Sequence, residues 1–211
     1  MALSMTDRAL AERVTPAGRD GIYAQVALVA LGIAILTLSA KIQLYIWPSP
    51  VPVTMGTFAV LALGAAYGPR LGLATILGYM GLGALGADVF AGSGSVHGLS
   101  YMMGSTGGYL AGYVLATAAL GIAARAGWDR SVVKMAGAML IGNALIYVPG
   151  VLWLKHVIVA GGLYHADQFS SVWAQTIAWG VTPYLIGDAM KLALAALLLP
   201  GLWKIAGRLR G

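Results

Sequence analysis

The chain has 211 residues, of which 59% are hydrophobic and only 9% charged, with a net charge of +6 and no cysteine. Because a soluble domain carries about 25% charged residues, this composition excludes a soluble globular protein and indicates an integral membrane protein. The lack of cysteine excludes a disulfide, a thiol nucleophile and a cysteine-based metal site, and leaves the redox compartment open. The basic residues gather in particular turns and at the termini, which predicts membrane topology and no nucleic-acid partner.

A series of apolar segments follows along the chain, and its length allows roughly six membrane crossings of about 20 residues each. We expect an all-α protein with six transmembrane helices, over residues 22–46, 54–67, 71–86, 102–124, 132–155 and 183–203, and a connection over 161–180 that has room for a short helix. Residues 1–21 are predicted to be a cytoplasmic N-terminal segment. Residues 22–206 are predicted to form a single six-helix transmembrane domain.

Proline and glycine mark the breaks between these segments. Residues 47–52 contain three prolines and predict an extended loop, since each proline biases its predecessor away from the α region. Gly68-Pro69-Arg70 predicts a tight turn. Thr182 followed by Pro183 predicts the start of the last helix, with a hydroxyl cap and proline at the first helical position. A glycine at every fourth position from Gly104 to Gly112 predicts close helix packing.

The distribution of arginine and lysine predicts the orientation of the bundle. With six crossings, ten basic residues fall on one side, and they are Arg8, Arg13, Arg19, Arg70, Arg125, Arg130, Lys134, Lys204, Arg208 and Arg210. The other side holds only Lys155. Cytoplasmic loops carry the excess of arginine and lysine, so both termini are predicted to face the cytoplasm. The loops 47–53, 87–101 and 156–182 then face outside.

Lys41, Asp188 and Lys191 are charged residues within predicted helices, and they mark a candidate binding site. A charge at the bilayer centre costs about 2.5–3.5 kcal/mol on insertion scales, so these side chains should face a protein interior or a wet cavity. Asp188 and Lys191 are three residues apart and therefore share a helix face. A pair that only joins helices together is the alternative. For Lys41 the alternative is a lysine that reaches from a helix end to the membrane interface.

No residue pattern of an enzyme or a metal site is found in the sequence. His97, His156 and His165 follow no metal-ligand spacing, and there is no Ser–His–acid arrangement, no His-Glu-x-x-His and no G-x-x-x-x-G-K-[ST] loop. We therefore predict no catalytic residue, no metal and no cofactor. On the first predicted helix, Ala30-x3-Ala34 forms a face of small residues, suited to internal packing or to docking of a partner helix.

Several further stretches, spread over residues 22–200, resemble parts of a known family and follow one another in that family's order. They are Pro50-Val51-Pro52-Val53-Thr54 with Thr57, Gly68-Pro69-Arg70-Leu71-Gly72, Gly78-Tyr79-Met80-Gly81-Leu82-Gly83, Val89-Phe90-Ala91-Gly92, Thr106-Gly107-Gly108-Tyr109-Leu110, and Pro183 to Lys191. Together they resemble the BioY-type biotin-specific S components of energy-coupling-factor (ECF) transporters. The sequence departs from that pattern at Gly56 for glutamine, at Asp88, Ser105 and Ile186 for proline, and at Tyr184 for phenylalanine.

The resemblance implies an S-component bundle whose outward-facing pocket captures biotin. It also implies a transmembrane T subunit and two ATPase subunits as partners in the bacterial cytoplasmic membrane, with ATP used only by these partners. The face formed by Ala30 and Ala34 then becomes the expected contact with the T subunit. An S component for another vitamin and a stand-alone small-solute transporter are the alternatives, and a homo-oligomer is left open.

The chemistry of biotin suggests how the candidate residues would be used. Its ureido ring has two N–H donors and one carbonyl. Asp188 would accept from the N–H groups, and Lys191 would donate to the carbonyl. The opposite assignment, with Lys191 or Lys41 on the biotin carboxylate, stays open.

The remaining expected contacts are with the apolar rings and the tail of biotin. Phe90, Tyr79 and Tyr109 would supply apolar walls and hydroxyl groups. The N–H groups of the first helical turn near Thr106-Gly107 are a second candidate for the carboxylate.

Overall fold

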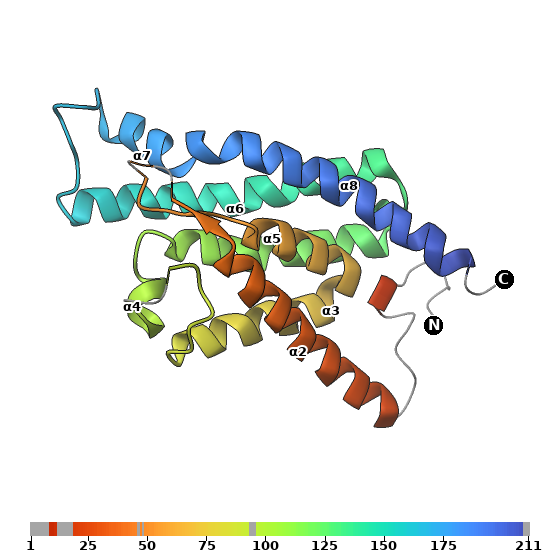
Figure 1. The fold of residues 1–211 in the computed structure, drawn as a ribbon. Coiled ribbons are helices and arrows are strands. Elements are labelled where there is room, and N and C mark those ends of the chain that lie inside the picture. The colour runs from red at the N-terminus through yellow and green to blue at the C-terminus, as the bar shows by residue number, and fades with distance from the viewer. Residues whose placement is uncertain (1–8, 12–18, 46, 48, 93–95, 209–211) are drawn as a thin grey trace.

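Helices make up most of the computed structural model, which describes residues 9–11, 19–45, 47, 49–92 and 96–208 (Figure 1). They are α2 (Arg19–Lys41), α3 (Gly56–Ala84), α4 (Gly98–Met102), α5 (Gly107–Arg125), α6 (Val132–Ala160), α7 (Val172–Gly180) and α8 (Leu185–Arg208), with 3-10 turns η1 (Trp128–Arg130) and η2 (Thr182–Tyr184). Two short strands, β1 (Gln43–Leu44) and β2 (Val53–Thr54), pair antiparallel. The all-helical class predicted from the sequence is confirmed.

Segment α3 consists of two helical arms folded back on each other. Gly68 has φ 74° and ψ 177°, in a region that favours glycine, and Pro69 follows it. A Cβ built on Gly72 would lie 3.5 Å from the Cα of Gly64. In one continuous helix these two residues would be about 12 Å apart along the axis. The tight turn predicted at Gly68 is therefore confirmed, and the two arms run side by side (Figure 1, orange and yellow).

Five helical stretches of the described residues are long and apolar enough to cross a membrane. They are Gly21–Lys41, Gly56–Ala84, Gly107–Arg125, Val132–Ala160 and Val172–Gly201. Because Gly56–Ala84 is folded into two arms, the fold contains five to six apolar helices. The number of complete crossings stays a prediction.

Several predicted helix boundaries differ from the observed ones. The first ends at Lys41 and not at residue 46, because Gln43 and Leu44 pair with strand β2 and begin a hairpin around the proline-rich loop. The helix predicted from residue 102 begins only at Gly107, since residue 102 is the end of the separate short helix α4. The carbonyl of Gly104, between them, accepts a hydrogen bond of 2.8 Å from the Trp153 indole.

The start of the last helix also differs in its cap. Thr182 does not act as the cap, because its hydroxyl donates to the carbonyl of Ile177 in α7. Val181 is instead the N-cap of the turn η2, and α8 begins at Leu185. The short helix for which the sequence left room within 161–180 is α7.

Helix α5 is the centre of the bundle and packs closely between α3 and α6. A Cβ built on Gly112 would lie 2.6 Å from the Cα of Ile146 in α6, and one on Gly121 would lie 2.4 Å from the Pro69 nitrogen in α3. These contacts leave no room for a side chain, so glycine sets the distance between the helices. The predicted packing role of the glycine stripe is confirmed for Gly108 and Gly112, which both face α6.

The ends of the helices meet in two groups. At one end α2 stops, the first arm of α3 starts, its second arm stops, and α5 and α8 start, with α4 and α7 beside them (Figure 1). At the other end lie the Gly68 turn, η1 and the C-terminal end of α8. The first group surrounds the candidate site.

Candidate ligand-binding site

A pocket of about 730 Å³, including its open mouth, lies among the helix ends of the first group. Residues of α2, α3, α5, α6, α8, the β1–β2 hairpin and the turn at 90–91 form its walls. Its aromatic lining consists of Tyr79, Phe90, Tyr101, Tyr109, Tyr113, Tyr147 and Tyr184. The pocket is therefore rich in aromatic residues, and the charged residues of its lining are Asp188 and Lys191.

Asp188 and Lys191 form a buried ion pair in the pocket wall. Lys191 Nζ lies 3.0 Å from Asp188 Oδ1 and 3.1 Å from Thr57 Oγ1, and the Tyr147 hydroxyl donates to Asp188 Oδ2 at 2.5 Å. The side chains of Lys191 and Asp188 are only 11% and 9% exposed. Asp188 is in the first turn of α8, where the helix dipole favours a negative charge. Both charges are thus paired and hydrogen-bonded, as buried charges must be.

The pair keeps hydrogen-bonding capacity for a ligand. An ammonium group has three donors, and two of those on Lys191 point to Asp188 and Thr57. A carboxylate offers about four acceptor positions, of which Lys191 and Tyr147 use one on each oxygen of Asp188. A ligand that carries both N–H donors and a carbonyl group would satisfy both side chains.

One wall of the pocket is built around Phe90. Its ring stacks on Tyr101, with centroids 4.9 Å apart, and meets the edge of Tyr79 at 5.2 Å. The Tyr79 hydroxyl donates to the carbonyl of Val89 at 3.0 Å, and the Tyr101 hydroxyl donates to that of Ala91 at 2.5 Å. Burial raises the pKa of Tyr101, which keeps its hydroxyl protonated as a donor. These two hydroxyls are used to hold the wall.

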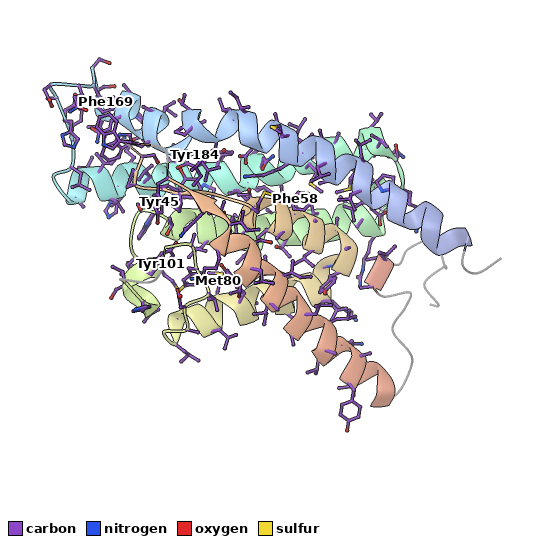
Figure 2. All side chains as sticks on the ribbon, viewed as in Figure 1. Tyr45, Phe58, Met80, Tyr101, Phe169 and Tyr184 are labelled. Carbon is purple, nitrogen blue, oxygen red and sulfur yellow. The ribbon has the colours of Figure 1, made fainter. Side chains whose placement is uncertain are left out.

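Another part of the wall belongs to the proline-rich loop, through Val51 and Pro52. The Ser49 hydroxyl donates to the carbonyl of Trp179 at 2.6 Å and lies 2.8 Å from the Tyr184 hydroxyl. Tyr184 in turn hydrogen-bonds the carbonyl of Val51. The loop is thereby tied to α7 and η2. Figure 2 shows Tyr184 at the same end of the bundle as Tyr45 and Tyr101.

Six of the eight residues predicted to bind the ligand line this pocket, and they are Asp188, Lys191, Tyr79, Phe90, Thr106 and Tyr109. Lys41 and Gly107 are not among the lining residues. Lys41 Nζ instead lies 2.5 Å from Asp88 Oδ1. The amide of Gly107 donates to the carbonyl of Gly104 at 3.1 Å. The Tyr109 hydroxyl donates to Gly180 at 2.8 Å, so this tyrosine offers the pocket mainly its ring.

Sequence reasoning missed Tyr147 and gave no role to Thr57. Both are polar groups inside apolar helices, a signal that marks functional positions in membrane proteins. Their partners could not be named, because α3 and α6 meet α8 only in the folded chain. Gly56 also lines the pocket, and a Cβ there would lie 3.0 Å from Thr54 Oγ1. A side chain at this position would therefore crowd Thr54 unless the threonine shifts.

Comparison with known proteins identifies the family. Residues 9–208 match the sequence model of the BioY family. The chain belongs to the BioY family. A relative from Pyrococcus horikoshii, named probable biotin transporter BioY, is 34% identical over 187 residues, covering 89% of this chain and 96% of its own length. The biotin transporter BioY of Rhodobacter capsulatus is 32% identical over 152 residues, covering 70% and 76%.

A solved structure confirms the fold expected of a BioY family member. The crystal structure of the S-component for biotin from an ECF-type ABC transporter superposes with a TM-score of 0.70. The match covers 90% of this chain and 95% of that chain at 18% sequence identity. The two chains thus share the fold of an S component.

The hydrogen bond from Tyr147 to Asp188 provides a test of the buried pair. We predict that Tyr147→Phe lowers the free energy of unfolding by about 1.5–3 kcal/mol, because a hydrogen bond to a charged group is lost from a buried site. Tyr164→Phe is the matched control, since it removes a hydroxyl that donates to the neutral carbonyl of Phe169 at 2.8 Å. Its expected loss is about 0.5–1.5 kcal/mol. Unfolding in mixed micelles measures both losses. Equal losses would show that the hydrogen bond to Asp188 stabilises the chain no more than one to a neutral carbonyl.

Proposed function

We propose that this chain is the biotin-binding S component of an ECF-type transporter. The observation that carries the proposal is the Asp188–Lys191 pair, buried and hydrogen-bonded in the wall of a pocket among the helix ends. Membership of the BioY family supports biotin as the ligand, as do relatives that are named biotin transporters. The function is capture of biotin for uptake, and no reaction is proposed.

In this proposal the ureido ring of biotin lies against the ion pair. Asp188 accepts from the ureido N–H groups, and Lys191 donates to the ureido carbonyl. Because the pair is already balanced in charge, the neutral ring adds no net charge to the buried site. The apolar bicyclic body then packs on Phe90 and Tyr109, and the carboxylate tail extends away from the pair.

The proposed orientation has the pocket open to the outside. Arg70, Arg125 and Arg130 belong to the turns at the opposite end of the bundle, next to Gly68 and in or before η1. Positive residues are enriched on the cytoplasmic side, which supports a cytoplasmic position for these turns. With the two arms of α3 counted separately, the chain would cross the cytoplasmic membrane six times, with both termini inside.

Titration calorimetry on the purified chain, with thiamine and riboflavin as other vitamins, tests this ligand assignment. We predict selective binding of biotin without a partner or ATP. Asp188→Asn and Lys191→Ala should each abolish it while the chain stays folded, because each leaves the surviving charge buried without its partner. The matched controls are Asp167→Asn in an exposed loop and Lys155→Ala, whose Nζ lies 4.2 Å from the centroid of the Trp173 ring.

The outcomes of this titration separate the alternatives. Wild-type affinity in either pocket variant would contradict the assignment of Asp188 and Lys191. Selective binding of another vitamin would leave an S component with a different substrate. Biotin methyl ester distinguishes the two ligand orientations, since it keeps the ureido ring and removes the carboxylate charge. We expect it to bind, whereas loss of binding that is independent of the ureido ring would favour the orientation with the carboxylate on Lys191.

We further propose that the exposed face of α2 docks a transmembrane T subunit. Helix α2 packs against α3, and Ala30 and Ala34 are both exposed on its other face. They therefore do not pack inside this chain, and small residues in a membrane helix allow a partner helix to approach closely. The sequence has no phosphate-binding loop, so energy would come from two ATPase subunits joined through the T subunit.

Larger side chains on this face of α2 should impair biotin transport and leave biotin binding intact. The double variant Ala30→Leu with Ala34→Leu is predicted to keep wild-type biotin affinity and to lose co-purification with the T subunit and most biotin uptake in cells. Ala193→Leu, at an exposed alanine on α8, is the matched control and should leave uptake unchanged. Full uptake by the double variant, or by the wild-type chain in cells without T and ATPase subunits, would favour a stand-alone transporter.

A further inference from the structure

The pocket wall formed by residues 87–92 is fastened to α2 from outside the pocket. Lys41, the last residue of α2, places its Nζ 2.5 Å from Asp88 Oδ1 and 2.9 Å from the carbonyl oxygen of Phe90. Phe90 lines the pocket, as does Ala40, the neighbour of Lys41, but neither Lys41 nor Asp88 does. One lysine therefore bridges the end of α2 and the turn that carries the Phe90 ring.

We infer that Lys41 and Asp88 are positioning residues, which hold Phe90 in the pocket wall and thereby set how often the pocket opens and how fast its ligand leaves. This assigns Lys41 a role other than contact with the biotin carboxylate. The inference rests on the proposed function only for the identity of the ligand. Opening of the wall itself can be measured in the ligand-free chain.

The roles of the two charges follow from their contacts. Lys41 supplies the donor that reaches the Phe90 carbonyl, so it fixes the backbone that carries the ring. Asp88 supplies the opposite charge that keeps Lys41 at the turn, where a lysine at a helix end would otherwise extend toward the membrane interface. The Phe90 ring itself is 1% exposed and stacks on Tyr101, so a shift of this backbone would expose a buried wall.

The strength of this link suits a wall that opens reversibly. The side chains of Lys41 and Asp88 are 35% and 54% exposed, so water and salt reach both. Exposed ion pairs stabilise a structure only slightly and are weakened by added salt. The hydrogen bonds from Tyr79, which is buried, and Tyr101, which is partly buried, hold the same turn to α3 and α4. Loss of the ion pair should therefore loosen the wall without unfolding the bundle.

The absence of cysteine from the sequence allows a direct measurement of opening. Val89→Cys places a thiol next to Phe90 at a position that is 8% exposed, and its rate of labelling by a water-soluble maleimide reports opening of the wall. Ala138→Cys, at a 2% exposed position in α6, is the matched control for general unfolding. Each reporter is combined with Lys41→Met, Asp88→Asn or the conservative Lys41→Arg.

We expect Lys41→Met and Asp88→Asn to speed labelling of Val89→Cys about two- to five-fold, with Ala138→Cys unchanged. Lys41→Arg should retain most of the wild-type protection. Raising salt from about 10 mM to about 1 M should speed labelling in the wild-type background and have little effect in the neutral variants. Unchanged Val89→Cys rates, or an equal rise at Ala138→Cys, would overturn the inference.

Biotin then separates this inference from the proposed function. Dissociation of labelled biotin should accelerate in Lys41→Met by about the same factor as the opening measured without ligand. If opening accelerates but the chain binds no biotin, the positioning role holds and the ligand assignment fails. If biotin binds and dissociates at the wild-type rate from both neutral variants, the positioning role is overturned and the ligand assignment holds.

Discussion

The buried ion pair of Asp188 and Lys191 is the constraint on which the site depends. Each charge costs about 2.5–3.5 kcal/mol at the bilayer centre on insertion scales, so the surrounding helices must supply partners. Tyr147 from α6 and Thr57 from α3 do so, which joins three helices at one point. A buried pair of this kind is often replaceable by apolar residues without loss of stability. Its presence is therefore better explained by a ligand than by the fold.

The backbone of α3 brings the two sides of the pocket together. The reversal at Gly68 places Thr57, on the first arm, and Tyr79, on the second arm, in walls of the same pocket. Gly112 and Gly121 let α5 approach both neighbours, so that the start of α5 also reaches the pocket. Glycine thus acts twice, once in the turn and once in close helix packing, and both uses position polar groups that are distant in sequence.

The helical membrane fold and the charged pair were predictable from the sequence, and the contacts that were not predictable share a physical cause. Composition predicts a membrane bundle, and isolated charges predict the Asp188–Lys191 pair, because charge in an apolar segment is costly whatever surrounds it. Thr182 followed by Pro183 predicts a helix cap, but the Thr182 hydroxyl donates to the carbonyl of Ile177 in α7. No local pattern indicates that Lys41 pairs with Asp88 or that Tyr147 donates to Asp188. Both depend on contacts between residues more than 40 positions apart.

The claim that the buried pair serves the ligand is tested most directly by replacing both charges together, as Asp188→Leu with Lys191→Met, because no charge is left unpaired. Biotin binding by calorimetry and thermal unfolding are measured on the same detergent-purified sample. The account predicts a folded chain whose melting temperature is unchanged or higher and which no longer binds biotin. Retained biotin binding would contradict the assignment of the pair to the ligand, and loss of the fold would show that the pair serves the structure.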